Sequence, residues 1–159
     1  MPVKDVKMGL GTKVPYPNLV NLYECSIGDN CFIGPFVEIQ KGAEIGNNCR
    51  VQSHSFICSK VSMGNNVFVG HGVVFINDRH PPRFDEKDWE EVVVGDNVAI
   101  GSNATLMPVR IGANSVIGAG AVVTKDVPPN SVAMGNPAEI TPRKAGDVHA
   151  ASDNQQPGQ

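Results

Sequence analysis

The sequence predicts an all-β fold in which short strands and tight turns wind into stacked coils, and three observations predict it. Large apolar residues recur at every sixth position over most of the chain. The composition combines 17 Gly and 12 Pro with only 6% aromatic residues, which suits small stacked side chains and frequent turns better than a helical bundle. Hydrophobic residues make up 41% of the 159 residues, which is enough for one sizeable core. A short fixed period is typical of solenoids, in which each repeat buries its apolar face against the next.

The first block of repeats holds its phase over nine hexads. We expect the residue that opens each hexad to point inward as the main core filler. The fifth residue is small or β-branched, as in Val37 and Ala43, and is expected to point inward where there is less space. Glycine often takes the second place, where we expect it to allow the unusual backbone angles of a turn, which other residues adopt at a cost. The opening residues are Ile27, Ile33, Ile39, Ile45, Val51, Ile57, Met63, Val69 and Phe75.

A second block of six hexads resumes this pattern and skips one residue halfway. Three hexads close one triangular coil of about 18 residues, so the two blocks predict about five coils. A less regular opening turn, residues 15–26, precedes them. The opening residues of the second block are Val94, Ile100, Leu106, Ile111, Ile117 and Val123.

The cysteines fit the same repeat. Cys25, Cys31 and Cys49 occupy the inward fifth position, which predicts stacked core residues rather than a metal site. Cys58 falls on a second position, where we expect it to be more exposed. No disulfide is required, which agrees with a reducing compartment.

Residues 76–93, with the sequence INDRHPPRFDEKDWEEVV, interrupt the repeat and are predicted to form a loop ejected between coils. Insertions on solenoids map to one face, which is often the binding face, so we expect a functional loop. A solvated excursion without a role is the alternative. We assign residues 1–142 to one domain and residues 143–159 to a polar tail that we expect to be disordered.

Three histidines lie outside the predicted core. His54 and His71 are separated by 17 residues, close to one coil, so they are expected on neighbouring coils of one face. His80 opens the loop and precedes Pro81, which favours an exposed position at the edge of a coil. Imidazole can exchange a proton near neutral pH, which makes these side chains candidates for acid–base chemistry.

Charge and hydropathy exclude several classes of function. The net charge of −3 and the pI near 5.7 argue against a nucleic-acid or anionic-membrane partner. No apolar run reaches the ~18 residues of a membrane helix. The first residues, MPVKDVKMGLG, have no apolar segment of signal-peptide length. We therefore expect a soluble, cytoplasmic protein.

The hexads, the loop that begins VVFINDRHPPR and the closing stretch IGANSVIGAGAVVTKDVPPNSVAMGNPA resemble the hexapeptide-repeat acyltransferases that use acetyl-CoA. The similarity covers about residues 19–142 and implies a left-handed parallel β-helix. The stretch from NLYECSIGDN to NDRHPP, residues 21–82, is similar to the subgroup that N-acetylates nucleotide-linked amino sugars for surface polysaccharides. The resemblance implies a homotrimer with active sites between subunits; the outward Phe32, Phe56 and Phe68 offer interface material.

The resemblance also implies where acetyl-CoA binds, along a groove parallel to the helix axis. The repeat stacks Gly101 and Ser102 one coil below Gly118 and Ala119, so small side chains expose backbone groups with which an extended pantetheine arm can pair. Further residues are expected at the phosphates and the adenine end of the cofactor. These are Lys125, for which a solvated turn lysine is the alternative, together with Pro137 and Arg143.

The catalytic residues implied by the resemblance lie in the loop. Asn77 is expected to contact the acceptor next to the thioester, and His80 matches the histidine before proline that serves as base in related sugar O-acetyltransferases. His54 is a second candidate, and Asp78 and Arg79 are expected to contact the acceptor. Either His80 takes the amine proton, or that proton passes to the departing CoA sulfur.

Three other functions remain open. His80 before Pro81 also favours an O-acetyltransferase that acts on a sugar or an antibiotic. A metal-dependent lyase of the γ-carbonic-anhydrase type needs three imidazoles around zinc, but the intervals of 17 and 9 residues between His54, His71 and His80 do not match it, so no metal is expected. A non-catalytic β-helix that binds partners is the third.

Overall fold

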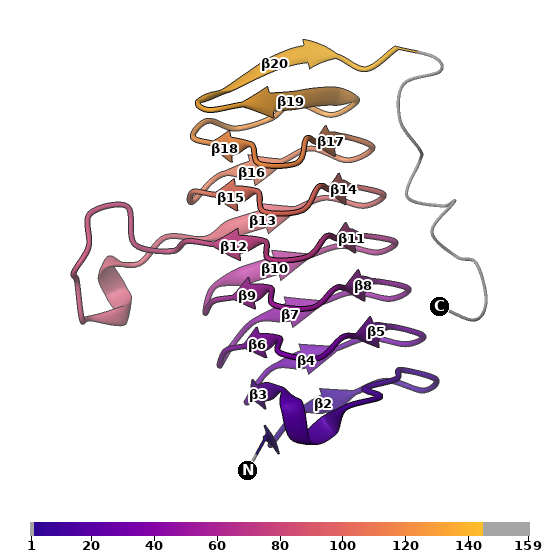
Figure 1. The fold of residues 1–159 in the computed structure, drawn as a ribbon. Coiled ribbons are helices and arrows are strands. Elements are labelled where there is room, and N and C mark those ends of the chain that lie inside the picture. Colours follow the sequence, from indigo (N-terminus) through magenta and orange to yellow (C-terminus); the bar gives the residue numbers. More distant parts are fainter. Residues whose placement is uncertain (1, 145–159) are drawn as a thin grey trace.

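The computed structural model describes residues 2–144 as a left-handed parallel β-helix of about seven turns, which confirms the predicted fold (Figure 1). The strands form three sheets of seven, six and seven members. We call them sheet A, sheet B and sheet C. Each turn of the coil passes from sheet B to sheet C and on to sheet A, so strands that follow each other in the sequence lie in different sheets up to β19.

Most strands are two or three residues long. Sheet A contains β1 (Val3–Lys4), β3 (Asn21–Tyr23), β6 (Glu38–Ile39), β9 (Phe56–Ile57), β12 (Val74–Phe75), β15 (Thr105–Leu106) and β18 (Val122–Val123). Sheet B contains β2 (Lys7–Met8), β4 (Ser26–Ile27), β7 (Glu44–Ile45), β10 (Val61–Met63), β13 (Val92–Val94) and β16 (Arg110–Ile111). Sheet C contains β5 (Phe32–Ile33), β8 (Arg50–Val51), β11 (Phe68–Val69), β14 (Ala99–Ile100), β17 (Val116–Ile117), β19 (Ser131–Gly135) and β20 (Ala138–Pro142). Two short 3₁₀ helices are η1 (Pro17–Leu19) and η2 (Glu86–Asp88).

The three corners between the sheets are named by the sheets they join. Corner BC follows a strand of sheet B, corner CA follows a strand of sheet C, and corner AB follows a strand of sheet A. The large loop of residues 76–91 leaves the coil at corner AB, between β12 and β13, and extends away from the stacked coils (Figure 1).

The interior is built as the hexads predict. The opening residues fill it, with Ile33, Ile57 and Phe75 fully buried. The fifth positions Cys25, Cys31 and Cys49 are buried as well, as predicted. The expectation for Cys58 was wrong: its side chain is 3% exposed because the turn after β9 directs it into the core cluster.

The reason for the second-position glycines also differs from the prediction. Among residues 2–144, the left-handed angles fall mostly on the fourth positions of the hexads, as at Asn48 and Asn66, both with φ of 57°. The second-position glycines have no positive φ; they are required because the next coil passes close by. A Cβ on Gly70 would lie 2.7 Å from the backbone nitrogen of Ser102, inside the contact distance of real Cβ atoms.

The coil extends further than the five predicted turns. At the N-terminal end, Val3 pairs with Leu22 and Lys7 with Ser26, so the first residues add strands in register with the hexads. The hexad pattern did not predict β2 because its apolar residue, Met8, pairs with Ile27 but lies outside the six-residue phase and is exposed at the end of the stack. At the other end, β19 and β20 pair antiparallel and end the parallel stack.

The tail predicted over residues 143–159 lies almost wholly outside the described residues. Arg143 is described, and its backbone N–H donates to the Asn130 carbonyl. Within residues 2–144, no helix is long and apolar enough to cross a membrane.

Candidate active site at two corners of the coil

The ejected loop is anchored at its base to the coils above and below it. The Asn77 amide nitrogen donates to the carbonyl oxygen of Ser59, one coil below, at 2.9 Å. An Arg79 guanidinium nitrogen donates to the Pro108 carbonyl, one coil above, at 2.7 Å. The Asn77 carbonyl accepts from the Glu90 N–H at 2.7 Å, which closes the loop. This bracing holds Asn77 and Arg79 at fixed positions on corner AB.

Asp78 organises the inside of the loop. One carboxylate oxygen accepts from Arg83 Nε at 2.8 Å and from the His80 N–H at 3.0 Å, and the other accepts from the Arg83 N–H at 2.7 Å. Desolvation by burial acts to raise the pKa of Asp78, but the hydrogen bonds from Arg83 and His80 outweigh it and leave the pKa below its ordinary value. The carboxylate predicted to contact the acceptor is thus fully engaged within the loop.

The part of the loop distant from the coil is held by hydrogen bonds from residues that the sequence analysis did not select. The Trp89 indole N–H donates to the Arg83 carbonyl at 2.7 Å, and Lys60 Nζ donates to the Trp89 carbonyl at 3.0 Å. Asp85 caps η2 by accepting from the Lys87 N–H. Lys60 lies one coil below, at the same corner, so the hexad count could have pointed to it.

His80 presents its ring at the surface of this loop. The residue is exposed, and its backbone N–H is fixed by Asp78. Lys125 is exposed on the same corner two coils further along, between β18 and the bridge of Val127 to Ile111. Five predicted site residues therefore share corner AB: Asn77, Asp78, Arg79, His80 and Lys125.

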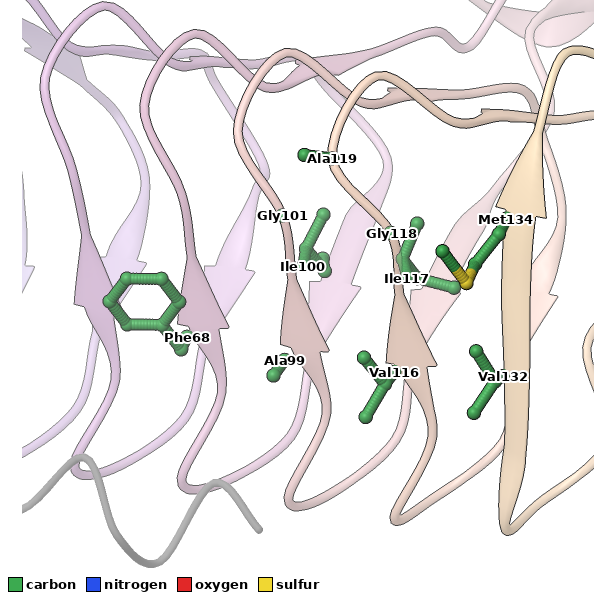
Figure 2. Close-up of a pocket in the computed structure, with 10 residues that line it drawn as sticks. All are labelled: Phe68, Ala99, Ile100, Gly101, Val116, Ile117, Gly118, Ala119, Val132 and Met134. Atoms are coloured by element: carbon green, nitrogen blue, oxygen red, sulfur yellow. The ribbon is translucent and has the colours of Figure 1, made fainter. Parts of the chain in front are cut away.

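The glycine column predicted for the cofactor runs along corner CA. Gly101 and Gly118 follow β14 and β17, and a Cβ on Gly101 would collide with the backbone of Ala119, which confirms that the coils stack as predicted. The column borders a groove of about 390 Å³ on the outer face of sheet C (Figure 2). Its lining is almost entirely apolar: Phe68, Ala99, Ile100, Gly101, Val116, Ile117, Gly118, Ala119, Val132 and Met134.

Figure 2 shows Phe68 at one end of this groove and Met134 at the other, with Ala99, Gly101 and Val116 among the residues between them. The sequence analysis missed Val132 and Met134 because they lie on β19, outside the hexad phase. Pro137 is exposed in the turn from β19 to β20, at the same end as Met134. Arg143 lies apart, at corner BC, where a guanidinium nitrogen donates to the Asn114 carbonyl at 3.0 Å.

The two upstream histidines lie on corner CA. His54 is exposed, and its ring packs against Phe36 in a tilted arrangement, with centroids 4.9 Å apart. His71 Nδ1 lies 2.9 Å from Ser53 Oγ. His80 belongs to a different corner, so the three histidines do not converge. Among residues 2–144, no group of three His, Cys, Asp or Glu side chains could hold a metal ion.

The predicted site residues therefore separate into two sets within one chain. The loop and Lys125 lie on corner AB, whereas His54, the glycine column and Pro137 lie on corner CA. Sheet A separates the two corners, so one chain does not bring Asn77 and His80 to the predicted cofactor groove.

The sequence matches two families of hexapeptide repeats. Residues 24–59 match the family described as bacterial transferase hexapeptide (six repeats), and residues 91–125 match the hexapeptide repeat of succinyl-transferase. The bifunctional protein GlmU of Streptococcus uberis is 38% identical over 112 residues, which are 70% of this chain and 23% of GlmU. The chain spans about a quarter of the length of the curated relatives that it matches.

Solved structures share the fold over a larger part of the chain. Galactoside acetyltransferase in complex with coenzyme A is 26% identical, covers 98% of this chain and 70% of its own, and has a TM-score of 0.62. AntD, an N-acyltransferase from Bacillus cereus solved with dTDP and coenzyme A, covers 89% of this chain and 80% of its own with a TM-score of 0.67. At 17% identity, AntD is evidence for the fold alone.

Proposed function

The chain belongs to the hexapeptide-repeat acyltransferase superfamily, and on that premise we propose that it transfers the acetyl group of acetyl-CoA to the amino group of a nucleotide-linked amino-deoxy sugar. The observation that carries the proposal is the separation of the site residues. A loop with Asn77 and His80 occupies one corner of the coil, and a groove beside a glycine column occupies another.

A homotrimer joins the two sets. A three-fold axis parallel to the coil brings corner AB of one copy against corner CA of the next, three times over, with closed symmetry. The outer face of sheet C supplies apolar contact material for such an assembly. Phe32 and Phe68 are half-buried there, and the Arg50 guanidinium lies 4.5 Å from the centroid of the Phe32 ring.

The groove on corner CA suits the donor. An extended pantetheine arm can lie in the apolar groove that Gly101 and Gly118 border. Lys125 of the neighbouring copy and Pro137 lie toward the C-terminal end of that groove, which supports placing the phosphates and the adenine there. The thioester then points toward the coil that carries the loop.

The chemistry is acyl transfer from a thioester to a neutral amine. Asn77 donates its amide N–H to Ser59, so its side-chain oxygen can accept a hydrogen bond from the amine and orient the attack. His80, exposed beside it in the loop, takes the proton that the amine loses; direct passage of this proton to the CoA sulfur is the other route. Asp78 fixes the His80 backbone by accepting its N–H, and Arg79 ties the base of the loop to Pro108 in the coil above.

A sugar O-acetyltransferase is the second candidate, favoured by the exposed His80 ring on a braced loop. A hydroxyl nucleophile needs a base more than an amine does. Replacement of His80 should therefore abolish an O-acetyltransferase and leave an N-acetyltransferase with substantial activity.

Release of free CoA thiol from acetyl-CoA, measured against nucleotide-linked 3- and 4-amino sugars and simple hexoses, tests the proposal. We expect release with an amino sugar alone. His80→Ala, compared with the loop control Lys87→Ala, then separates the two proton routes. Release with hydroxyl sugars alone would replace the proposal by O-acetylation, and a chain that does not bind acetyl-CoA would overturn both.

A further inference from the structure

A stack of polar residues lies on corner CA, and the function proposed above uses none of their side-chain groups. Ser53, His71 and Ser102 occupy equivalent places in three successive coils. The His71 Nδ1 atom lies 2.9 Å from Ser53 Oγ, and the His71 backbone N–H donates to Ser102 Oγ at 3.2 Å. His71 is an exposed residue whose ring is nevertheless fixed in orientation by a neighbour. Because Nδ1 is engaged, Nε2 is the ring nitrogen that can contact a ligand.

This histidine lies at one end of the groove. Gly70, the residue before it, continues the glycine column one coil below Gly101, and Phe68 of the same strand forms the groove's end wall (Figure 2). The other end is bounded by Met134 and the turn with Pro137. If the phosphates lie at that C-terminal end, as proposed above, the reactive end of the cofactor reaches the coil of His71.

The same coil carries the loop. Residues 61–75 form one turn that holds His71 and then leads directly into Asn77. Rotation about an axis parallel to the coil does not change height, so Asn77 and His80 of a neighbouring copy lie level with His71. The thioester end of the groove, the loop of the neighbour and His71 thus meet at one height.

We propose that His71 is a further residue of the acetyl-transfer site, in which Nε2–H donates a hydrogen bond to the carbonyl oxygen of the bound thioester. The Ser53 hydroxyl donates to Nδ1 and so holds the ring in the tautomer with its proton on Nε2. This inference rests on the proposed function.

His71 itself gains and loses no proton in the reaction. The amine nitrogen forms a bond to the thioester carbon, and the carbonyl oxygen carries the resulting negative charge, which the Nε2–H bond stabilises. The C–S bond then breaks, and the proton lost by the amine ends on the CoA sulfur, by way of His80 or directly. The products are the amide and CoA thiol, so atoms and charges balance.

Steady-state kinetics of four variants test this role: His71→Ala, His71→Gln, Ser53→Ala and Ser62→Ala. Ser62 is exposed on sheet B of the same coil and is the matched control for Ser53→Ala. We expect His71→Ala to lower kcat about 100-fold with little change in the KM for acetyl-CoA, as for the loss of one oxyanion donor. His71→Gln keeps an N–H donor and should recover part of kcat. The kcat of Ser53→Ala should lie between those of His71→Ala and the wild type. An unchanged kcat for His71→Ala in an active enzyme would overturn the inference alone.

A binding measurement separates this inference from the acceptor assignment. The ring ¹⁵N signals of His71, assigned by comparison with His71→Gln, are recorded during titration with acetyl-CoA. A shift of Nε2 with Nδ1 unprotonated supports the contact even if no amino sugar is acetylated, a result that would overturn the proposed function only. Binding of acetyl-CoA without any change at His71 would contradict the inference.

Discussion

Arg83 donates two hydrogen bonds to the Asp78 carboxylate, one from Nε at 2.8 Å and one from its backbone N–H at 2.7 Å. The same arginine accepts the Trp89 indole N–H on its carbonyl, so one residue links the base of the loop to its returning arm. A loop closed in this way can present Asn77 and His80 to another molecule at defined positions, which an unbraced excursion cannot.

Replacement of Asp78 by Asn removes the charged acceptor from this arrangement. We expect kcat to fall about 10- to 100-fold, because small displacements of positioned groups are costly in rate, while the coil unfolds at nearly the same temperature. Trp89 is the only tryptophan, so a change in its emission reports the loosened loop directly. Glu86→Gln, in η2, is the control and should match the wild type. Wild-type kcat in Asp78→Asn would show that the loop is ordered without this contact.

The pH dependence of the loop follows from the same carboxylate. Desolvation opposes ionisation of Asp78, but the hydrogen bonds from Arg83 and His80 lower its pKa overall. A lowered pKa in the folded state means that the stabilisation is present above the unfolded value, near 3.9, and is lost as the pH falls through the lower folded value. We expect Trp89 emission to stay constant from neutral pH down to about 4 and to change only in stronger acid. A transition in this emission between pH 5 and 7 would contradict the assignment.

The buried thiols of Cys25 and Cys58 should be inert in the folded protein. Desolvation raises the pKa of Cys58 to about 12 and that of Cys25 to about 11, so both stay protonated at neutral pH. Iodoacetamide, followed by mass spectrometry, should label them only after denaturation. Rapid labelling of native Cys58 would place it at the surface, as the hexad position alone had suggested.

The coil interior should respond strongly to truncation. Ile57 is fully buried, and Ile57→Ala should lower the free energy of unfolding by about 2–5 kcal/mol, against about 0.5–1.5 kcal/mol for Ile57→Val. Phe84 is 89% exposed in the loop and serves as the contrast, since Phe84→Ala should change stability by less than about 0.5 kcal/mol. Denaturant titration measures all three. Equal effects at both positions would contradict the hexad assignment.

The repeat made the interior of the coil predictable, because a six-residue period assigns each inward position independently of distant contacts. Ile33 and Cys49 follow from that rule alone. Cys58 and the strand Lys7–Met8 did not, because turn geometry and pairing with the next coil override the pattern at those places. The positions of the second-position glycines were predicted correctly, but the reason for them was not. These glycines are required by close contact with the next coil, which the sequence of a single hexad does not reveal.

The sequence predicted which residues form the candidate site better than it predicted how these residues are arranged in space. The contacts of Arg83 and Trp89 depend on an irregular backbone that has no period to count. The groove wall at Met134 depends on a strand that has left the repeat. The separation of Asn77 from Gly101 onto different corners does follow from counting hexads, and it leads directly to the central claim that each active site is shared between two copies.

Mixed assembly of two defective variants tests this claim most directly. One variant carries Asn77→Ala with His80→Ala, and the other carries Ala99→Trp, whose larger side chain projects into the groove from β14. In a cyclic trimer every mixed assembly contains one intact pair of corners, so random mixing at equal amounts should restore about one quarter of wild-type activity. That recovery, absent when each variant is assembled alone, is the result that the shared site predicts. No recovery in mixed trimers whose composition is verified by native mass spectrometry would place the site within a single chain and contradict the account.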